Sequence, residues 1–244
     1  MEDIAPELYN RIQDEMKRLL SHAGNVTGLE RKIRQGKASQ RDVARYADIV
    51  GQAASEAFKK VLKLEDLPDG KLYWNIAEKT IGATLIGVYG DVNTVAALQL
   101  RGDDIRKGFS IGIKRGTDPD NRIKVVLEMA SGQTSQEALD NAMTDPVIST
   151  ARKFYDDFQL ANGDVRDALG FDEVVVRHYD DRGLHNGKTP CTWCLQREGT
   201  FSIQDAHRLG VFERHPGCGC TIEVITPDRT QVQTDWTRNE WTEI

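Results

Sequence analysis

The fold is decided by Cys191-Thr192-Trp193-Cys194 and by His215-Pro216-Gly217-Cys218-Gly219-Cys220, which together hold all four cysteines of this 244-residue chain. A Cys-x-x-Cys turn directs two thiols to one point, and the second segment offers three more sulfur or nitrogen donors. Zn²⁺ prefers four such ligands in a tetrahedron. The spacing therefore predicts a structural zinc site, and its five candidate ligands are Cys191, Cys194, His215, Cys218 and Cys220.

Two alternatives to this zinc site stay open at the level of sequence. Four cysteines could form two disulfides, but no apolar signal segment is present, so we expect synthesis in a reducing cytosol, where disulfides are rare. His215 precedes a proline and could be a turn residue rather than a ligand. The sequence does not decide which four of the five candidates bind the metal.

Amphipathic helical patterns run through residues 1–170. Apolar residues at helical spacing predict a helix over residues 6–20, and Ser39 is a plausible N-cap for a second helix that ends near Leu64. A third helical region begins near Tyr73, and a separate short helix is expected from Asp91 to about Gly102. Further helices should begin at Asp118-Pro119, at Thr134 or Ser135, and after Pro146. These patterns predict a helical body.

The pattern changes at Gly170, where we place the domain boundary. Residues 174–179 and 220–225 form strand-like runs on either side of the cysteine motifs. We therefore expect a mainly α protein, with a small α+β lobe at residues 171–226 in which a β-hairpin frames the zinc site. The metal would replace the hydrophobic core that so short a segment cannot build. Residues 227–244 form a polar tail, whose Trp236 and Trp241 could anchor on a partner.

The chain has 32 basic and 38 acidic residues and a net charge of −6, which argues against a free-standing nucleic-acid-binding module. Its longest apolar run, residues 81–100, is broken by glycines and polar residues, so we expect a buried helix and no membrane partner. No phosphate-binding glycine loop, Gly-x-Ser-x-Gly or His-Glu-x-x-His occurs. Polar residues do gather before Cys191, and we interpret them as support for the zinc ligands and as a solvated turn. They are His178, Asp180, Asp181 and His185.

The C-terminal motifs resemble those of phage Mu F-type minor head proteins. The resemblance rests on residues 177–181, the Cys191-x-x-Cys194 turn, Gly199-Thr200-Phe201, and residues 211–220 leading into the strand at 221–225. In that family an all-helical region precedes a Cys-x-x-Cys and a His-Pro-Asn-Cys-Arg-Cys box. This chain has Gly217 and Gly219 where asparagine and arginine are usual, so any role of that arginine is not carried over.

The resemblance implies a structural, non-catalytic virion protein inside the head of a tailed phage, near the portal. It would be made in the host bacterial cytoplasm and contribute to head assembly or genome delivery. Its partners would be the portal or the major capsid protein, with possible contact to packaged DNA and no small-molecule substrate.

A second hypothesis is a zinc-dependent hydrolase or nuclease. Cys191, Cys194 and a third ligand would hold the metal, while His178, His185 or Asp181 would act on water. The number of protein ligands separates the two hypotheses, because a zinc ion with four protein ligands has no position left for a reactive water.

Overall fold

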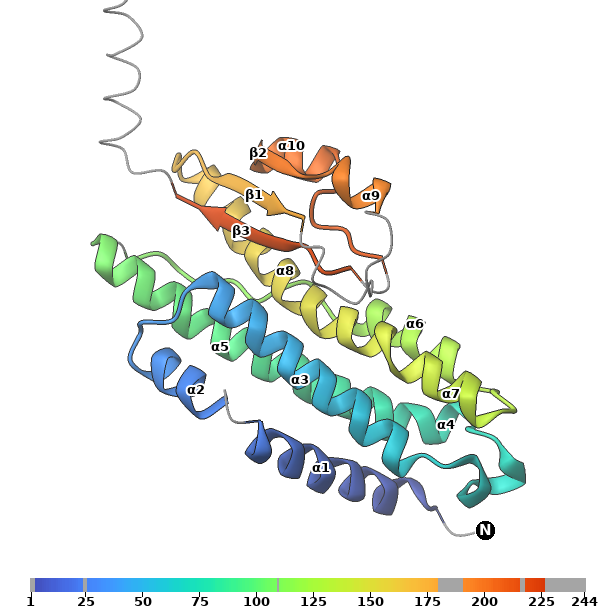
Figure 1. The fold of residues 1–244 in the computed structure, drawn as a ribbon. Helices are drawn as coiled ribbons and strands as arrows, with labels where there is room; N and C mark the ends of the chain where they lie inside the picture. The colour runs from blue at the N-terminus through green and yellow to red at the C-terminus, as the bar shows by residue number, and fades with distance from the viewer. Residues whose placement is uncertain (1–2, 24–25, 109, 180–190, 216–217, 227–244) are drawn as a thin grey trace, which may run out of the picture.

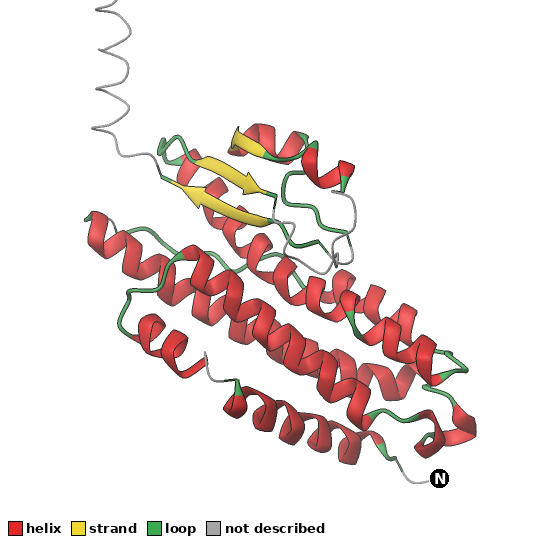
Figure 2. Cartoon of the chain, viewed as in Figure 1, coloured by secondary structure: helices red, strands yellow, loops and turns green. Residues whose placement is uncertain are grey.

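The structure is a computed structural model that describes residues 3–23, 26–108, 110–179, 191–215 and 218–226. It confirms the predicted fold class: the protein is mainly α-helical, with a small three-stranded antiparallel sheet near the C-terminus (Figure 1, Figure 2). The helices of the body are α1 (Ala5–His22), α2 (Val26–Arg34), α3 (Gln40–Val61), α4 (Trp74–Ala77), α5 (Ala83–Lys107), α6 (Asp120–Ala130), α7 (Gln136–Met143) and α8 (Asp145–Ala168). Two short 3₁₀ turns, η1 (Leu64–Asp66) and η2 (Pro68–Gly70), and a π-helical turn, η3 (Glu78–Gly82), connect them.

Helices α3, α5 and α8 lie side by side at the centre of the body, and α1 packs along α3 (Figure 1). The predicted N-cap of α3 is confirmed, since the Ser39 hydroxyl accepts the Asp42 N–H and the Asp42 carboxylate accepts the Ser39 N–H in a capping box. Apolar side chains from all four helices are buried in one core, each contributing about 1.5–3 kcal/mol by leaving water. Examples are Ile12, Phe58, Leu85 and Phe154.

The expected separate helix at residues 91–102 is wrong, because α5 is one continuous helix of 25 residues. Gly87 and Gly90 have low helix propensity, but both lie inside α5. Packing of α5 against α3 and α8 outweighs that local preference. Helix α2 was not predicted, and Val26, Leu29 and Ile33 form its buried face.

One segment, Trp74–Lys107, is long and apolar enough to cross a membrane by length and composition. Of its most apolar window, 44% is buried within the protein, where Leu85, Val88 and Val92 belong to the body core. Core helices of proteins without any membrane contact share this length and composition, so the test by itself is weak. The absence of a membrane partner stays a prediction.

The C-terminal lobe contains β1 (Val174–His178), α9 (Thr192–Leu195), β2 (Gly199–Ser202), α10 (Ile203–Arg208) and β3 (Thr221–Ile225). The two predicted strands, β1 and β3, are confirmed as antiparallel neighbours, with Val175 opposite Val224. Strand β2 was not predicted, and it pairs with the other side of β1 to give the order β2-β1-β3. The lobe's own apolar core is small, and its buried members are Val175, Ile203, Ala206, Val211, Phe212 and Ile222.

The lobe packs along α8 from Arg152 to Gly163 (Figure 1). Arg214 forms a bidentate ion pair with Asp156 of α8, and both side chains are buried. The Lys153 ammonium donates to the Phe212 carbonyl at 2.6 Å. A Cβ at Gly163 would lie 2.7 Å from Ile203 Cδ1, so the missing side chain lets the lobe approach the helix. Whether the chain divides at residue 170 into separately folding domains stays a prediction.

Candidate metal centre

The five candidate ligands come from two segments at one end of the sheet. Cys191 precedes α9 and Cys194 lies within it, so one turn of helix presents both sulfurs on the same side. His215, Cys218 and Cys220 lie in the segment that leads into β3. Because β1 pairs with both β2 and β3, the sheet brings these two segments together.

The ligand atoms form two overlapping groups that share Cys194. His215 Nε2 lies 3.0 Å from Cys194 Sγ and 3.3 Å from Cys191 Sγ. Cys194 Sγ lies 3.8 Å from Cys218 Sγ, and Cys220 completes the second group with these two sulfurs. Within each group all ligand atoms lie within 4.8 Å of one another. The predicted residues therefore meet in a cluster that could hold a metal ion.

The donor set and its spacing fit a tetrahedral zinc ion. Zinc–sulfur bonds of about 2.3 Å in a tetrahedron place neighbouring sulfurs about 3.8 Å apart. The distance between Cys194 Sγ and Cys218 Sγ matches this tetrahedral edge. All four cysteines are free thiols in the structure, and Cys194, Cys218 and Cys220 are at most 3% exposed.

The thiol pKa values differ within the cluster because hydrogen bonds and burial act unequally on them. A hydrogen bond from Cys220 lowers the pKa of Cys218 far below its usual range, and the positive charges of Arg214 and Arg177 add to this effect. The same hydrogen bond, together with burial, raises the pKa of Cys220. Burial raises the pKa of Cys194 to about 11. A metal that binds Cys194 must therefore displace its proton, which couples metal binding to pH.

Three arginines surround the cysteine segment, and none of them was predicted as part of the site. Arg152 of α8 donates to the Cys218 carbonyl and pairs with Asp48 of α3. Arg214 donates to the Cys220 carbonyl at 2.7 Å and lies 3.9 Å from Cys218 Sγ. Arg177 of β1 is fully buried and faces the sulfurs of Cys194 and Cys218. The alternation of β1 was a usable signal for Arg177, because it places this charge on the buried face with Val175.

Aromatic side chains complete the surroundings of the cluster. Trp193 and Tyr179 pack against the buried cysteines. Trp193 also meets the His215 ring edge-on, with ring centroids 5.5 Å apart, and the Arg197 guanidinium lies 3.9 Å from its ring centroid. These contacts restrict the orientation of His215, which favours a fixed ligand geometry.

Of the residues expected to act on water in the hydrolase alternative, the structure describes His178 alone. His178, at the end of β1, is exposed. Asp180, Asp181 and His185 lie outside the described residues, as do Trp236 and Trp241 of the tail.

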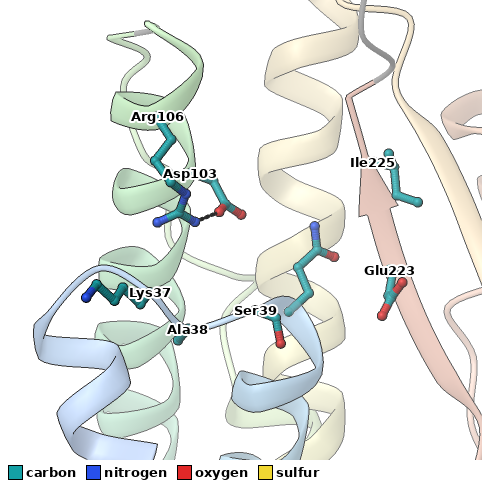
Figure 3. A pocket seen from close by; sticks show the side chains of 8 residues that line it. Lys37, Ala38, Ser39, Asp103, Arg106, Glu223 and Ile225 are labelled. Carbon is teal, nitrogen blue, oxygen red and sulfur yellow. Dashed lines mark hydrogen bonds and ion pairs between the residues drawn. The ribbon is translucent and has the colours of Figure 1, made fainter. Parts of the chain in front are cut away.

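A surface pocket of about 490 Å³ lies where the segment before α3, the end of α5 and strand β3 meet (Figure 3). Its charged side chains are largely paired within the protein. Arg106 donates to Asp103 and to the Gly36 carbonyl, and Glu223 pairs with Arg41 at 2.6 Å. No cluster residue is among those that line this pocket, so it is separate from the candidate metal centre.

Compared with protein-family models, curated proteins and solved structures, the chain matches none of them.

Proposed function

We propose that this chain is a structural protein without catalytic turnover, and that a zinc ion holds its C-terminal lobe together. The observation that carries the proposal is the cluster of five sulfur and nitrogen donors, three of them almost fully buried. With four protein ligands the ion has no position for a reactive water, which favours a structural over a catalytic role.

The small size of the lobe core supports a structural role for the metal. Only six buried apolar residues make up that core among the residues that the structure describes. Lobes of this size commonly need a metal or disulfides to fold, because their apolar core alone does not offset the entropy of ordering the chain.

Elemental analysis of protein purified under reducing conditions and without chelator tests this part of the proposal. We expect about one zinc per chain and four thiols that react only after the metal is removed. Absence of metal together with thiols oxidised in pairs would replace the zinc site by two disulfides.

The biological role that we propose is that of a minor head protein of a tailed phage, located inside the head near the portal. The order of the Cys-x-x-Cys turn, the His-Pro-Gly-Cys-Gly-Cys segment and the strand that follows supports it, as does the helical body before them. The body would dock on the portal or the major capsid protein, and the zinc lobe would maintain the shape of the C-terminal part.

Mass spectrometry of purified virions tests this location directly, and we expect the chain in the head at low copy number. Deleting residues 171–244 should impair assembly or ejection, whereas Asp181→Ala and His185→Ala should leave infectivity near wild type. Loss of infectivity from either point substitution, with folding and packaging unchanged, would favour the zinc hydrolase or nuclease instead.

A further inference from the structure

Arg177 is a buried cation without a carboxylate partner. Its side chain is 0% exposed, and its Nη1 donates to the carbonyls of Val211 and Glu213. Its Nη2 points at sulfur, 3.6 Å from Cys218 Sγ and 3.9 Å from Cys194 Sγ. Among the described residues no carboxylate forms an ion pair with it. A buried charge of this kind is costly unless an opposite charge lies beside it.

The other two arginines near the cluster already have their counter-charges. Arg214 pairs with Asp156, and Arg152 pairs with Asp48. Among the described residues, Arg177 is therefore the guanidinium that lies against the sulfurs without a carboxylate partner, whereas Arg197 lies over the Trp193 ring. A zinc ion bound by three thiolates and a neutral histidine has one net negative charge, whereas a centre of four thiolates has two. The charge balance thus favours three cysteines and one histidine.

The contacts within the cluster favour one set of three cysteines. If His215 is a ligand, the other ligands must lie close to its Nε2, and Cys191 and Cys194 do so at 3.3 and 3.0 Å. The fourth ligand is then Cys218 or Cys220. Arg177 hydrogen-bonds both Cys218 and Cys220, so its contacts do not separate them. The distance of 3.8 Å between Cys218 Sγ and Cys194 Sγ, which matches a tetrahedral edge, favours Cys218.

We propose that the metal is bound by Cys191, Cys194, His215 and Cys218, that Cys220 lies beside this centre without binding the metal, and that Arg177 is its buried counter-charge. This assignment rests on the zinc site proposed above and makes Arg177 a positioning residue of that site. Four of the five candidates are then ligands, and the fifth, Cys220, is not.

Two cysteines only two residues apart provide a matched pair for testing the ligand set. Zinc affinity of the full-length chain would be measured by competition with a chromophoric chelator under reducing conditions. Cys220→Ser should leave the affinity within about threefold of wild type, less than the loss of an outer-shell partner typically causes. Cys218→Ser should weaken it by more than the roughly 100-fold that bounds outer-shell effects. Equal losses, or a larger loss for Cys220→Ser, would overturn the assignment.

The counter-charge role is tested by Arg177→Met and Arg177→Lys, with Arg166→Met as control. Arg166 is also buried and pairs with Asp104 and Glu173, but among the described residues no contact joins it to the cluster. Arg177→Met should weaken zinc binding about 10-fold or more, Arg177→Lys should recover part of the loss because it retains the charge, and Arg166→Met should leave the affinity unchanged. Zinc binding by Arg177→Met as tight as that of Arg166→Met would refute the role.

The cobalt(II) spectrum of the wild-type chain makes the ligand assignment testable without any variant that must fold. The intensity of its sulfur-to-cobalt charge-transfer bands reports the number of thiolates, and we expect three. Four thiolates would refute this assignment but leave the zinc-stabilised lobe intact. A wild-type chain that binds neither zinc nor cobalt would refute both, so the two failures are distinguishable.

Discussion

Gly51 lies where α3 and α8 approach each other closely. A Cβ at this position would lie 2.9 Å from Ala151 Cβ and 3.1 Å from the Cα of Ile148 on α8. Contacts this short require the helix backbones to separate, and helix-to-helix packing in a dense core resists that movement.

Gly51→Ala should therefore destabilise the protein by about 1–3 kcal/mol, although alanine is the better helix former. Gly87→Ala in α5 is the matched control, because nothing lies within 4 Å of its Cβ position. That substitution should stabilise by about 0.5–1 kcal/mol. Denaturant unfolding of both variants measures the difference, and a stabilising effect of Gly51→Ala would contradict the close approach of α3 and α8.

Some residues of the candidate site could be predicted from the sequence and others could not. The candidate ligands could be predicted because cysteines are few and their spacing along the chain is itself the signal. Arg152 could not be assigned to the cluster, because it reaches the Cys218 carbonyl from helix α8 only when the lobe packs on that helix. Contacts between distant segments leave no periodic pattern in the sequence.

Helix α8 is the element that joins the two parts of the protein. Its N-terminal half packs in the body, and Asp156 and Lys153 hold the lobe through Arg214 and the Phe212 carbonyl. The Arg214–Asp156 pair is almost fully buried, so removing one partner leaves an uncompensated charge.

Arg214→Met should cost about 3–5 kcal/mol for this reason. The double variant Arg214→Met/Asp156→Leu should recover most of that loss, because it removes both charges. Arg208→Met in α10 breaks an exposed ion pair with Asp205 and should change stability by less than about 0.5 kcal/mol. Thermal or denaturant unfolding measures the stability of the three variants. If Arg214→Met cost no more stability than Arg208→Met, the Arg214–Asp156 pair would not hold the lobe.

Helix α1 is attached to α3 by a carboxylate that titrates in the acidic range. Hydrogen bonds from Arg18 and then from Lys60 lower the pKa of Glu15 from 4.5 to about 2. The folded state therefore holds the ionised form more strongly than the unfolded chain does. The contribution of ionised Glu15 to the free energy of unfolding is complete above pH 4.5 and is lost as the pH falls toward 2.

Glu15→Gln should be less stable than wild type at pH 6, and the two chains should become equal in stability as the pH approaches 2. Urea unfolding at several pH values measures the difference. Arg18→Gln should remove most of the same pH dependence, since Arg18 is the stronger partner. A stability difference that stays constant from pH 6 to pH 2 would contradict the ionic role of Glu15.

The elements differ in how well their sequences indicated them. Helix α3 could be predicted because its capping residue and its apolar face agree. Helix α5 was wrongly divided, because polar residues such as Asn93 and Gln99 are buried while Ile86 and Ile105 are exposed, which blurs the amphipathic pattern and leaves the glycines as a misleading signal. Strand β2 has four residues with no fully buried side chain, so its sequence carries no clear strand pattern. It forms because its backbone pairs with β1.

For the whole molecule, the separate cores of body and lobe predict a partial response to metal removal. Chelation under reducing conditions, or Cys191→Ser, should unfold the lobe and leave most of the helical signal in circular dichroism. Hydrogen exchange should become fast in β1, β2 and β3 while α3 and α5 stay protected. Simultaneous loss of protection in both parts would show instead that body and lobe unfold as one unit.

Gln40 at the start of α3 has a consequence for how this protein can associate with copies of itself. Its amide donates to the Val224 carbonyl and accepts the Val224 N–H, as a neighbouring strand would do, so it occupies the outer edge of β3. Within the described sheet, β2 is then the strand whose outer edge no other strand covers. A sheet with one open edge can pair with the open edge of one other copy, which gives a closed dimer. A sheet with two open edges could add copies at both edges and form fibres. A side-chain amide thus protects the protein against polymerising through its sheet.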